Sequence, residues 1–110
     1  CLEYLFKKIS KEKIKIFLFY ETKNEIIGEI INSLKRKFNI NYTILKDSDY
    51  ETYEHLLLQS ICDHNILANS TFSFWGAYLN KNPNKIVLYP SKFFNLPPLC
   101  EKLNYKCIPV

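Results

Sequence analysis

The sequence predicts an α/β fold in which a parallel sheet carries helices on both faces, a Rossmann-like layout. Apolar runs typical of buried strands alternate with segments of helical periodicity along most of the chain. Hydrophobic residues make up 47% of the 110 residues, enough for a core, so disorder is not expected. We expect a Rossmann-like lobe over residues 1–94 and a C-terminal tail over residues 95–110.

Four segments are predicted to be strands that run parallel to one another. Residues 14–20 (IKIFLFY) form a nearly continuous apolar run, which is typical of a strand buried on both faces. The other three strands are expected over residues 42–45, 65–68 and 85–89, and Pro90 stops the last of them.

Helical periodicity fills the intervals between these strands. The predicted helices cover residues 2–10, 24–38, 50–62 and 71–80. In the third helix, Tyr53, Leu57 and Ile61 share one face, which we expect to point into the core. After Pro90 the pattern dissolves, and an extended segment with one helical turn is expected there.

The net charge and its distribution limit the classes of ligand that the chain is expected to bind. The net charge is +4, but the lysines are scattered along the sequence, so a solvated basic surface is favoured over nucleic-acid binding. A positive field would still suit an anionic ligand such as a sugar nucleotide.

No run of about 18 apolar residues and no signal peptide is present. Because the chain begins at Cys1 and contains no Met, we expect it to be part of a longer protein.

The cysteines do not predict a metal site. No two of the four form a C-x-x-C pair, and the two histidines complete no zinc pattern. Cys62 is expected to pack as a small hydrophobic residue. Cys100 and Cys107 would close a small disulfide loop in an oxidising compartment and stay reduced elsewhere, and the sequence leaves both states open.

The most informative local feature is the polar turn Asn69-Ser70-Thr71 between the third predicted strand and the helix after it. The start of a helix has unpaired N–H groups and a partial positive charge, which suit an anion such as phosphate. Ser, Thr and Asn are also the preferred helix N-caps, so capping and ligand binding are both open interpretations. With only two glycines, Gly28 and Gly76, the chain has no glycine-rich phosphate loop.

Other candidate groups have a simpler structural interpretation. Asp47 and Asp49 form a D-x-D, but aspartates commonly cap the helix that follows, and we expect no metal there. A lone histidine, such as His55 or His64, is more often a structural group than a base. The aromatic side chains of Phe74 and Trp75 could stack on a sugar or base, although a core position is favoured.

Residues 60–80 (SICDHNILANSTFSFWGAYLN), followed by residues 85–94 (KIVLYPSKFF), closely resemble the α-1,2-fucosyltransferase family. That family shows a Cys-x-His, an apolar triplet, an Ala-Asn-Ser-Ser/Thr-Phe-Ser-Trp-Trp-Gly-Ala-Tyr-Leu-Asn segment and a strand that ends in Pro. The likeness is long and unusual in composition, and it covers residues 50–94 well. Upstream it rests on the strand and helix pattern.

The resemblance implies one lobe of a two-lobed transferase of the GT-B type, which uses GDP-fucose and inverts the anomeric centre without a metal or other cofactor. This chain would be the donor-binding lobe. The acceptor would be a galactose-terminated glycan, and the catalytic residues are expected in the other lobe. The family motif would place five residues at the donor site, all but Phe72 against the diphosphate, with Glu54 or His55 reaching the ribose or base. Those five are Asn69, Ser70, Thr71, Phe72 and Ser73.

Several positions depart from the family pattern. Tyr20 and Glu21 replace an acidic pair, His55 replaces an Asp, Phe74 replaces a Trp, and the His-x-Arg-Arg-Gly-Asp motif of the other lobe is absent. These departures keep open the alternative of a catalytically inactive remnant or carbohydrate-binding lobe. A small doubly wound signalling domain is a second alternative, but it would need an acidic pocket at the end of the first strand, and Tyr20-Glu21 is a poor one. The resemblance leaves two locations for the parent protein, a membrane-anchored form on the lumenal side of the Golgi membrane or, alternatively, the bacterial cytoplasm.

Overall fold

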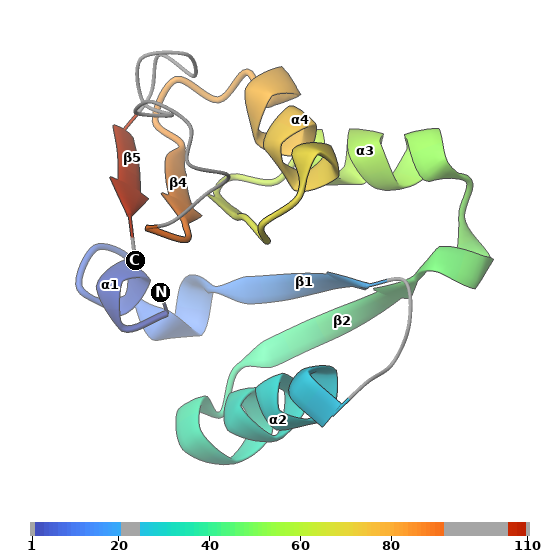
Figure 1. The fold of residues 1–110 in the computed structure, drawn as a ribbon. Coiled ribbons are helices and arrows are strands. Elements are labelled where there is room, and N and C mark those ends of the chain that lie inside the picture. Colours follow the sequence, from blue (N-terminus) through green and yellow to red (C-terminus); the bar gives the residue numbers. More distant parts are fainter. Residues whose placement is uncertain (1, 21–24, 92–105, 110) are drawn as a thin grey trace. The chain divides into compact units, whose positions relative to one another are not determined.

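A computed structural model describes residues 2–20, 25–91 and 106–109 (Figure 1). The chain divides into two compact units. Residues 2–55 form the N-terminal unit, and residues 56–110 form the C-terminal unit.

The N-terminal unit is built around a β–α–β element. Strands β1 and β2 pair in parallel, with Lys15 opposite Asn41 and Tyr20 opposite Lys46. This confirms the parallel pairing predicted for the first two strands. In chain order the elements are α1 (Leu2–Phe6), the 3-10 turn η1 (Lys11–Lys13), β1 (Lys15–Tyr20), α2 (Glu25–Asn32), the π-helical η2 (Ser33–Phe38), β2 (Asn41–Lys46), the 3-10 turn η3 (Asp47–Asp49) and the start of α3 (Thr52–Ser60).

The turn from η2 into β2 depends on a residue in the left-handed region. Asn39 has φ 49° and ψ 53°, a conformation that Asn tolerates better than most residues. The N–H of Ile40 then donates to the carbonyl of Leu34 over 3.1 Å, which closes the helix end. Both Leu34 and Ile40 are buried, so this hydrogen bond joins two residues of the core of the N-terminal unit.

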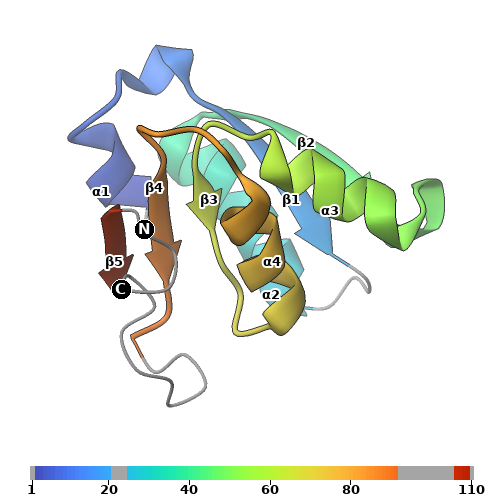
Figure 2. The same cartoon turned by 90° about the horizontal axis from the view of Figure 1, so that it is seen from above.

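The expectation that the first strand is buried on both faces is wrong. Phe17 is 43% exposed, and no residue of β1 is fully buried. The physical reason is that the described residues of the N-terminal unit form a sheet of two strands, and α2 with η2 lies along one face of them (Figures 1 and 2). Within this unit, the helices therefore cover one face of β1.

The C-terminal unit contains a second parallel sheet, in the order β3-β4-β5. Figure 2 shows β4 between its two neighbours. Val87 and Leu88 of β4 are completely buried, as expected for a central strand. Its elements are the rest of α3, β3 (Asn65–Ile66), α4 (Thr71–Leu79), β4 (Ile86–Tyr89) and β5 (Lys106–Pro109).

Strand β5 is a finding that the sequence did not predict. Residues 106–109 were expected to belong to an extended tail, and they instead pair in parallel with β4. A proline is tolerated here because β5 is the last strand in the sheet order, and an edge strand need not donate every N–H. The helical turn expected in the tail and Cys100 lie outside the described residues.

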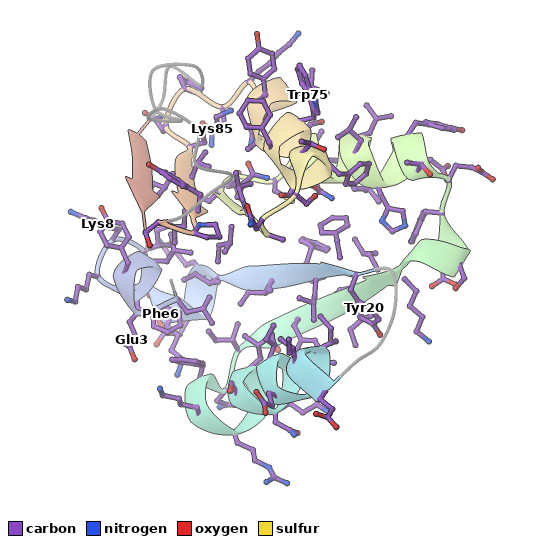
Figure 3. The ribbon with its side chains drawn as sticks, viewed as in Figure 1. Glu3, Phe6, Lys8, Tyr20, Trp75 and Lys85 are labelled. Atoms are coloured by element: carbon purple, nitrogen blue, oxygen red, sulfur yellow. The ribbon has the colours of Figure 1, made fainter. Side chains whose placement is uncertain are left out.

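The predicted inward faces of two helices are also wrong. On α3 and just after it, Tyr53, Leu57 and Ile61 are each more than half exposed, and the buried residue is His55. On α4, Trp75 is 50% exposed and points away from the helix (Figure 3).

Small residues explain the orientation of α4. Gly76 and Ala77 are its buried positions, and a Cβ atom built on Gly76 would lie 2.8 Å from the Cβ of Gln59. The two helices therefore approach through Gly76 and Gln59, and this contact turns the large aromatic rings of α4 outward. Together these findings confirm a mixed α/β fold with short parallel strands.

Candidate functional site

The polar turn lies at the carboxyl edge of the β3-β4-β5 sheet. Pairing continues one residue beyond β3, where the N–H of Leu67 donates to the carbonyl of Leu88 over 2.8 Å. The chain then turns through residues 68–70 into α4. In parallel sheets this edge is where ligands usually bind, because the strand ends and the helix starts meet there.

Ser70 is the N-cap of α4. Its backbone is extended (φ −146°, ψ 140°), and its Oγ accepts a hydrogen bond from the N–H of Ser73 over 3.3 Å. The hydroxyl of Ser73 in turn lies 2.9 Å from both the carbonyl of Ala68 and the carbonyl of Ser70. The capping interpretation of this turn is therefore confirmed. The hydroxyls of Ser70 and Ser73 both make hydrogen bonds that stabilise the conformation of the loop.

The remaining groups of the turn are placed differently. Asn69 and Thr71 are exposed, and Phe72 is half-buried. The first-turn N–H groups of Thr71 and Phe72 have no acceptor within the helix, as in any α-helix. The turn thus presents helix-end N–H groups beside the Thr71 hydroxyl, with the Ser70 cap fixing their geometry.

Glu54 and His55 belong to the N-terminal unit, and both have structural contacts there. The Glu54 carboxylate accepts from the N–H of Glu51 over 2.7 Å, which is the capping arrangement at the start of α3. The His55 ring is 5% exposed and packs edge-on against Phe19 (5.8 Å between centroids) and Tyr50 (5.5 Å). The donor-binding role expected for these two residues stays a prediction.

A buried polar cluster that the sequence did not predict lies at the other end of α4. Lys85 is 1% exposed, and its ammonium group donates to the carbonyls of Ala77 and, over 2.6 Å, Asn80 (Figure 3). A buried cation at this position satisfies the last carbonyls of the helix and complements its dipole. Asn80 continues the cluster by donating to Asn65 Oδ1 and to the carbonyl of Cys62.

The two other candidates near the sheet are also structural. His64 Nδ1 accepts from the N–H of Ile86 over 3.1 Å, so the ring is held beside β4 as an acceptor. The Cys62 thiol donates to the carbonyl of Leu58 over 3.2 Å. Burial, and to a smaller degree the neighbouring Asp63 carboxylate, raise the pKa of this thiol. Cys62 therefore behaves as a small protonated hydrophobic residue, as predicted.

The D-x-D segment forms the short turn η3, where Ser48 Oγ lies 3.5 Å from Asp49 Oδ1. Across residues 2–20, 25–91 and 106–109, no three His, Cys, Asp or Glu side chains gather in a way that could hold a metal ion. The same described ranges contain no helix with the length and apolar character needed to cross a membrane.

Comparison with known proteins identifies the family. The model of glycosyl transferase family 11 matches residues 15–106, which is most of the chain. The O-antigen biosynthesis glycosyltransferase WbnK of Escherichia coli is 46% identical over 55 residues, which cover 49% of this chain and 18% of that protein. The chain thus matches less than a fifth of the length of this relative. No solved structure matches the chain. The likeness seen in residues 50–94 is confirmed, and the chain belongs to glycosyl transferase family 11, the fucosyltransferase family.

Proposed function

We propose that this chain forms the nucleotide-sugar-binding part of a glycosyltransferase that transfers L-fucose from GDP-fucose in α-1,2 linkage to a galactoside. Membership of glycosyl transferase family 11 is the observation that carries this proposal. The parallel α/β fold is compatible with one lobe of a GT-B enzyme, and the polar turn lies at the edge of the sheet where such a lobe would bind its nucleotide.

In the proposed reaction, an acceptor hydroxyl attacks the anomeric carbon of fucose. A new carbon–oxygen bond forms as the bond from that carbon to the diphosphate oxygen breaks, and the configuration inverts. GDP leaves with the bonding electron pair, and negative charge builds on the diphosphate. The proton of the acceptor hydroxyl passes to a base among the catalytic residues expected in the other lobe. The N-terminal turn of α4 would stabilise this charge through the N–H groups of Thr71 and Phe72 and the Thr71 hydroxyl.

The cap of α4 gives this turn a second role. Ser70 and Ser73 are already bonded to each other and to the backbone of residues 68–70, so the loop does not have to reorganise when an anion arrives. Preorganised donors of this kind are more effective than mobile ones. We therefore assign direct contact with the diphosphate to Thr71 and the helix N–H groups, and a positioning role to Ser70 and Ser73. The contact expected for Asn69 rests on the family motif alone.

A catalytically inactive remnant or carbohydrate-binding lobe is the second candidate. His55, which stands where the family has an Asp, is buried between two aromatic rings, and Phe74 stands in place of a Trp. Of the two locations, the Golgi lumen and the bacterial cytoplasm, we propose the second, because the matched relative is a bacterial protein.

GDP binding to the protein that carries this chain tests the donor site. Thr71→Val removes the exposed hydroxyl and leaves the Ser70 cap intact. One charge-assisted hydrogen bond is worth about 1.5–3 kcal/mol, so GDP affinity in calorimetry should fall by about tenfold or more. Thr52→Val is the matched control, because Thr52 is the exposed first residue of α3 and should not affect GDP.

Three results test these assignments. If Thr71→Val binds GDP as well as the parent does, this turn is a helix cap only. If the protein binds GDP but transfers no sugar from GDP-fucose or from any other GDP-sugar, the inactive remnant is the correct description. Transfer from another GDP-sugar, with GDP-fucose inert, would keep the glycosyltransferase and overturn the fucose assignment.

A further inference from the structure

The fold gathers basic residues that look scattered in the sequence. One group precedes or begins β1, and the other lies in η2, directly before β2. Because β1 and β2 are parallel, with Lys15 opposite Asn41, both groups reach the same edge of the N-terminal unit. We call this surface the basic edge. Its members, all exposed, are Lys7, Lys8, Lys11, Lys13, Lys15, Lys35, Arg36 and Lys37.

Two contacts fix the groups beside each other. The rings of Phe6 and Phe38 lie 5.4 Å apart between centroids, and Lys37 Nζ lies 3.7 Å from the Glu3 carboxylate. Lysines also lie over these rings, Lys11 over Phe6 at 5.9 Å and Lys37 over Phe38 at 5.2 Å. Figure 3 shows the side chain of Lys8 pointing away from α1.

The basic edge carries more positive charge than the whole chain. Residues 2–15 and 33–41 contain its eight basic residues and only two acidic ones, Glu3 and Glu12, a formal charge of +6. The whole chain has a formal charge of +4, so everything else sums to −2. At the opposite end of β2 the charge reverses, with three acidic residues in sequence positions 47–51.

We propose that the basic edge docks on the surface of an anionic bilayer. Clusters of four to eight Lys and Arg side chains are attracted to acidic phospholipid headgroups. Seven of the eight basic residues are lysines, which act as hydrated point charges and need no matched partner geometry. The half-buried Phe6 and Phe38 supply apolar surface between the charges, the combination found in elements that lie at a membrane interface.

Charge composition disfavours nucleic acid as the partner. Specific base contacts rely largely on Arg, Asn and Gln, and Arg36 is the one arginine of the chain. Single-strand binders stack bases on exposed aromatic rings, whereas Phe6 and Phe38 are packed against each other. Docking by the basic edge does not depend on the donor site, because its members lie in the N-terminal unit and the α4 turn lies in the other.

Vesicle co-sedimentation of the chain tests this proposal. The vesicles are phosphatidylcholine alone or with about 30% phosphatidylglycerol, at about 0.1 M and about 1 M salt, where the screening length falls from about 10 Å to about 3 Å. The chain should bind only the anionic vesicles and only at low salt. The double variant Lys8→Gln/Lys13→Gln should bind about 25-fold more weakly, at about fivefold for each charge.

Matched controls keep the proposal falsifiable. Lys46→Gln/Lys81→Gln removes the same charge from exposed positions outside the basic edge and should change binding less than about twofold. Lys8 and Lys13 are chosen because both are exposed, so their replacement should leave the circular dichroism melt unchanged. The proposal is overturned if the parent chain ignores anionic vesicles, if the control pair loses as much binding, or if a labelled oligonucleotide binds at both salts while vesicles do not.

Discussion

Asn80 Nδ2 lies 2.8 Å from Asn65 Oδ1, which joins the end of α4 to the start of β3 inside the core of the C-terminal unit. Both side chains are buried, and the other polar atoms of the pair are also bonded. Asn80 donates to the carbonyl of Cys62 over 2.6 Å and accepts from the N–H of Asn82, while Asn65 donates to the carbonyl of Gln59 over 2.8 Å. A buried network satisfied in this way specifies one packing of helix on strand.

Replacement of the amide tests that network. Asn80→Asp keeps the shape of the side chain but replaces the donating amide group with a carboxylate oxygen. Two acceptors, Asn65 Oδ1 and the carbonyl of Cys62, would then face that oxygen. We expect the free energy of unfolding to fall by about 3 kcal/mol or more. Urea denaturation would show this as a lower midpoint with an unchanged slope. Asn84→Asp, at an exposed position, is the control, and equal losses in the two variants would contradict the network.

Lys85 offers an independent test at the same end of α4. Lys85→Met keeps the length of the side chain and removes the donor to the carbonyls of Ala77 and Asn80. Both carbonyls then lose the ammonium donor, while the carbonyl of Ala77 still accepts from the N–H of Asn80 over 3.3 Å. We therefore expect a loss of about 1–3 kcal/mol in the free energy of unfolding. Lys81→Met, on the exposed neighbouring turn, should change it by less than about 0.5 kcal/mol. If the two variants lose the same free energy of unfolding, Lys85 does not stabilise the end of α4.

The sequence predicted the elements better than their contacts. Apolar runs located β1, β2 and β4 closely, because strands of a parallel sheet are rich in apolar residues even where, as at Phe17 of β1, some of them are exposed. The family was predictable because residues 60–80 have an unusual composition over a long stretch. The N-cap at Ser70 was one of two interpretations, since Ser before an apolar run favours a cap whether or not a ligand binds.

The contacts depend on packing that no local pattern contains. An apolar stripe runs along α3 and the residue after it, through Tyr53, Leu57 and Ile61, yet these side chains are exposed. The contact between α3 and α4 is made instead by Gln59 against Gly76. In the sequence, Lys85 resembles the solvated first residue of a strand. Its burial could not be predicted, because its partners are backbone carbonyls at the end of the preceding helix α4. The basic edge likewise arises from parallel pairing, which brings residue 15 opposite residue 41 and so joins segments that are distant in the sequence.

Gly76 provides the third prediction. Gly76→Ala gains helix propensity of about 1 kcal/mol, but the new Cβ would lie 2.5 Å from Gln59 Oε1 and 2.8 Å from its Cβ. We expect a net loss of stability of about 1–2 kcal/mol from overpacking. Gln59→Ala removes the amide but keeps its own Cβ, so the double variant should recover only part of that loss. Additive effects in the double-mutant cycle would contradict direct contact at this position.

Cys62 provides the fourth prediction, which concerns alkaline pH. Burial first, and the Asp63 carboxylate second, raise the pKa of its thiol in the folded protein. The unfolded thiol therefore loses its proton at lower pH than the folded one, and the unfolded state binds fewer protons over that interval. Stability from the protonated thiol is complete below about pH 8.5, the ordinary thiol pKa, and is lost as pH rises through the folded pKa.

A serine at position 62 isolates this contribution, since its hydroxyl does not ionise in the same range. The other three cysteines are common to both proteins and cancel in the comparison. The stability difference between the parent and Cys62→Ser, measured by urea denaturation under reducing conditions, should be constant up to about pH 8.5 and then shift against the parent. Asp63→Asn should keep most of this dependence, because burial is the larger cause. A difference that stays flat, or that grows in favour of the parent above that pH, would show that the Cys62 thiol is not held in its protonated form by the fold.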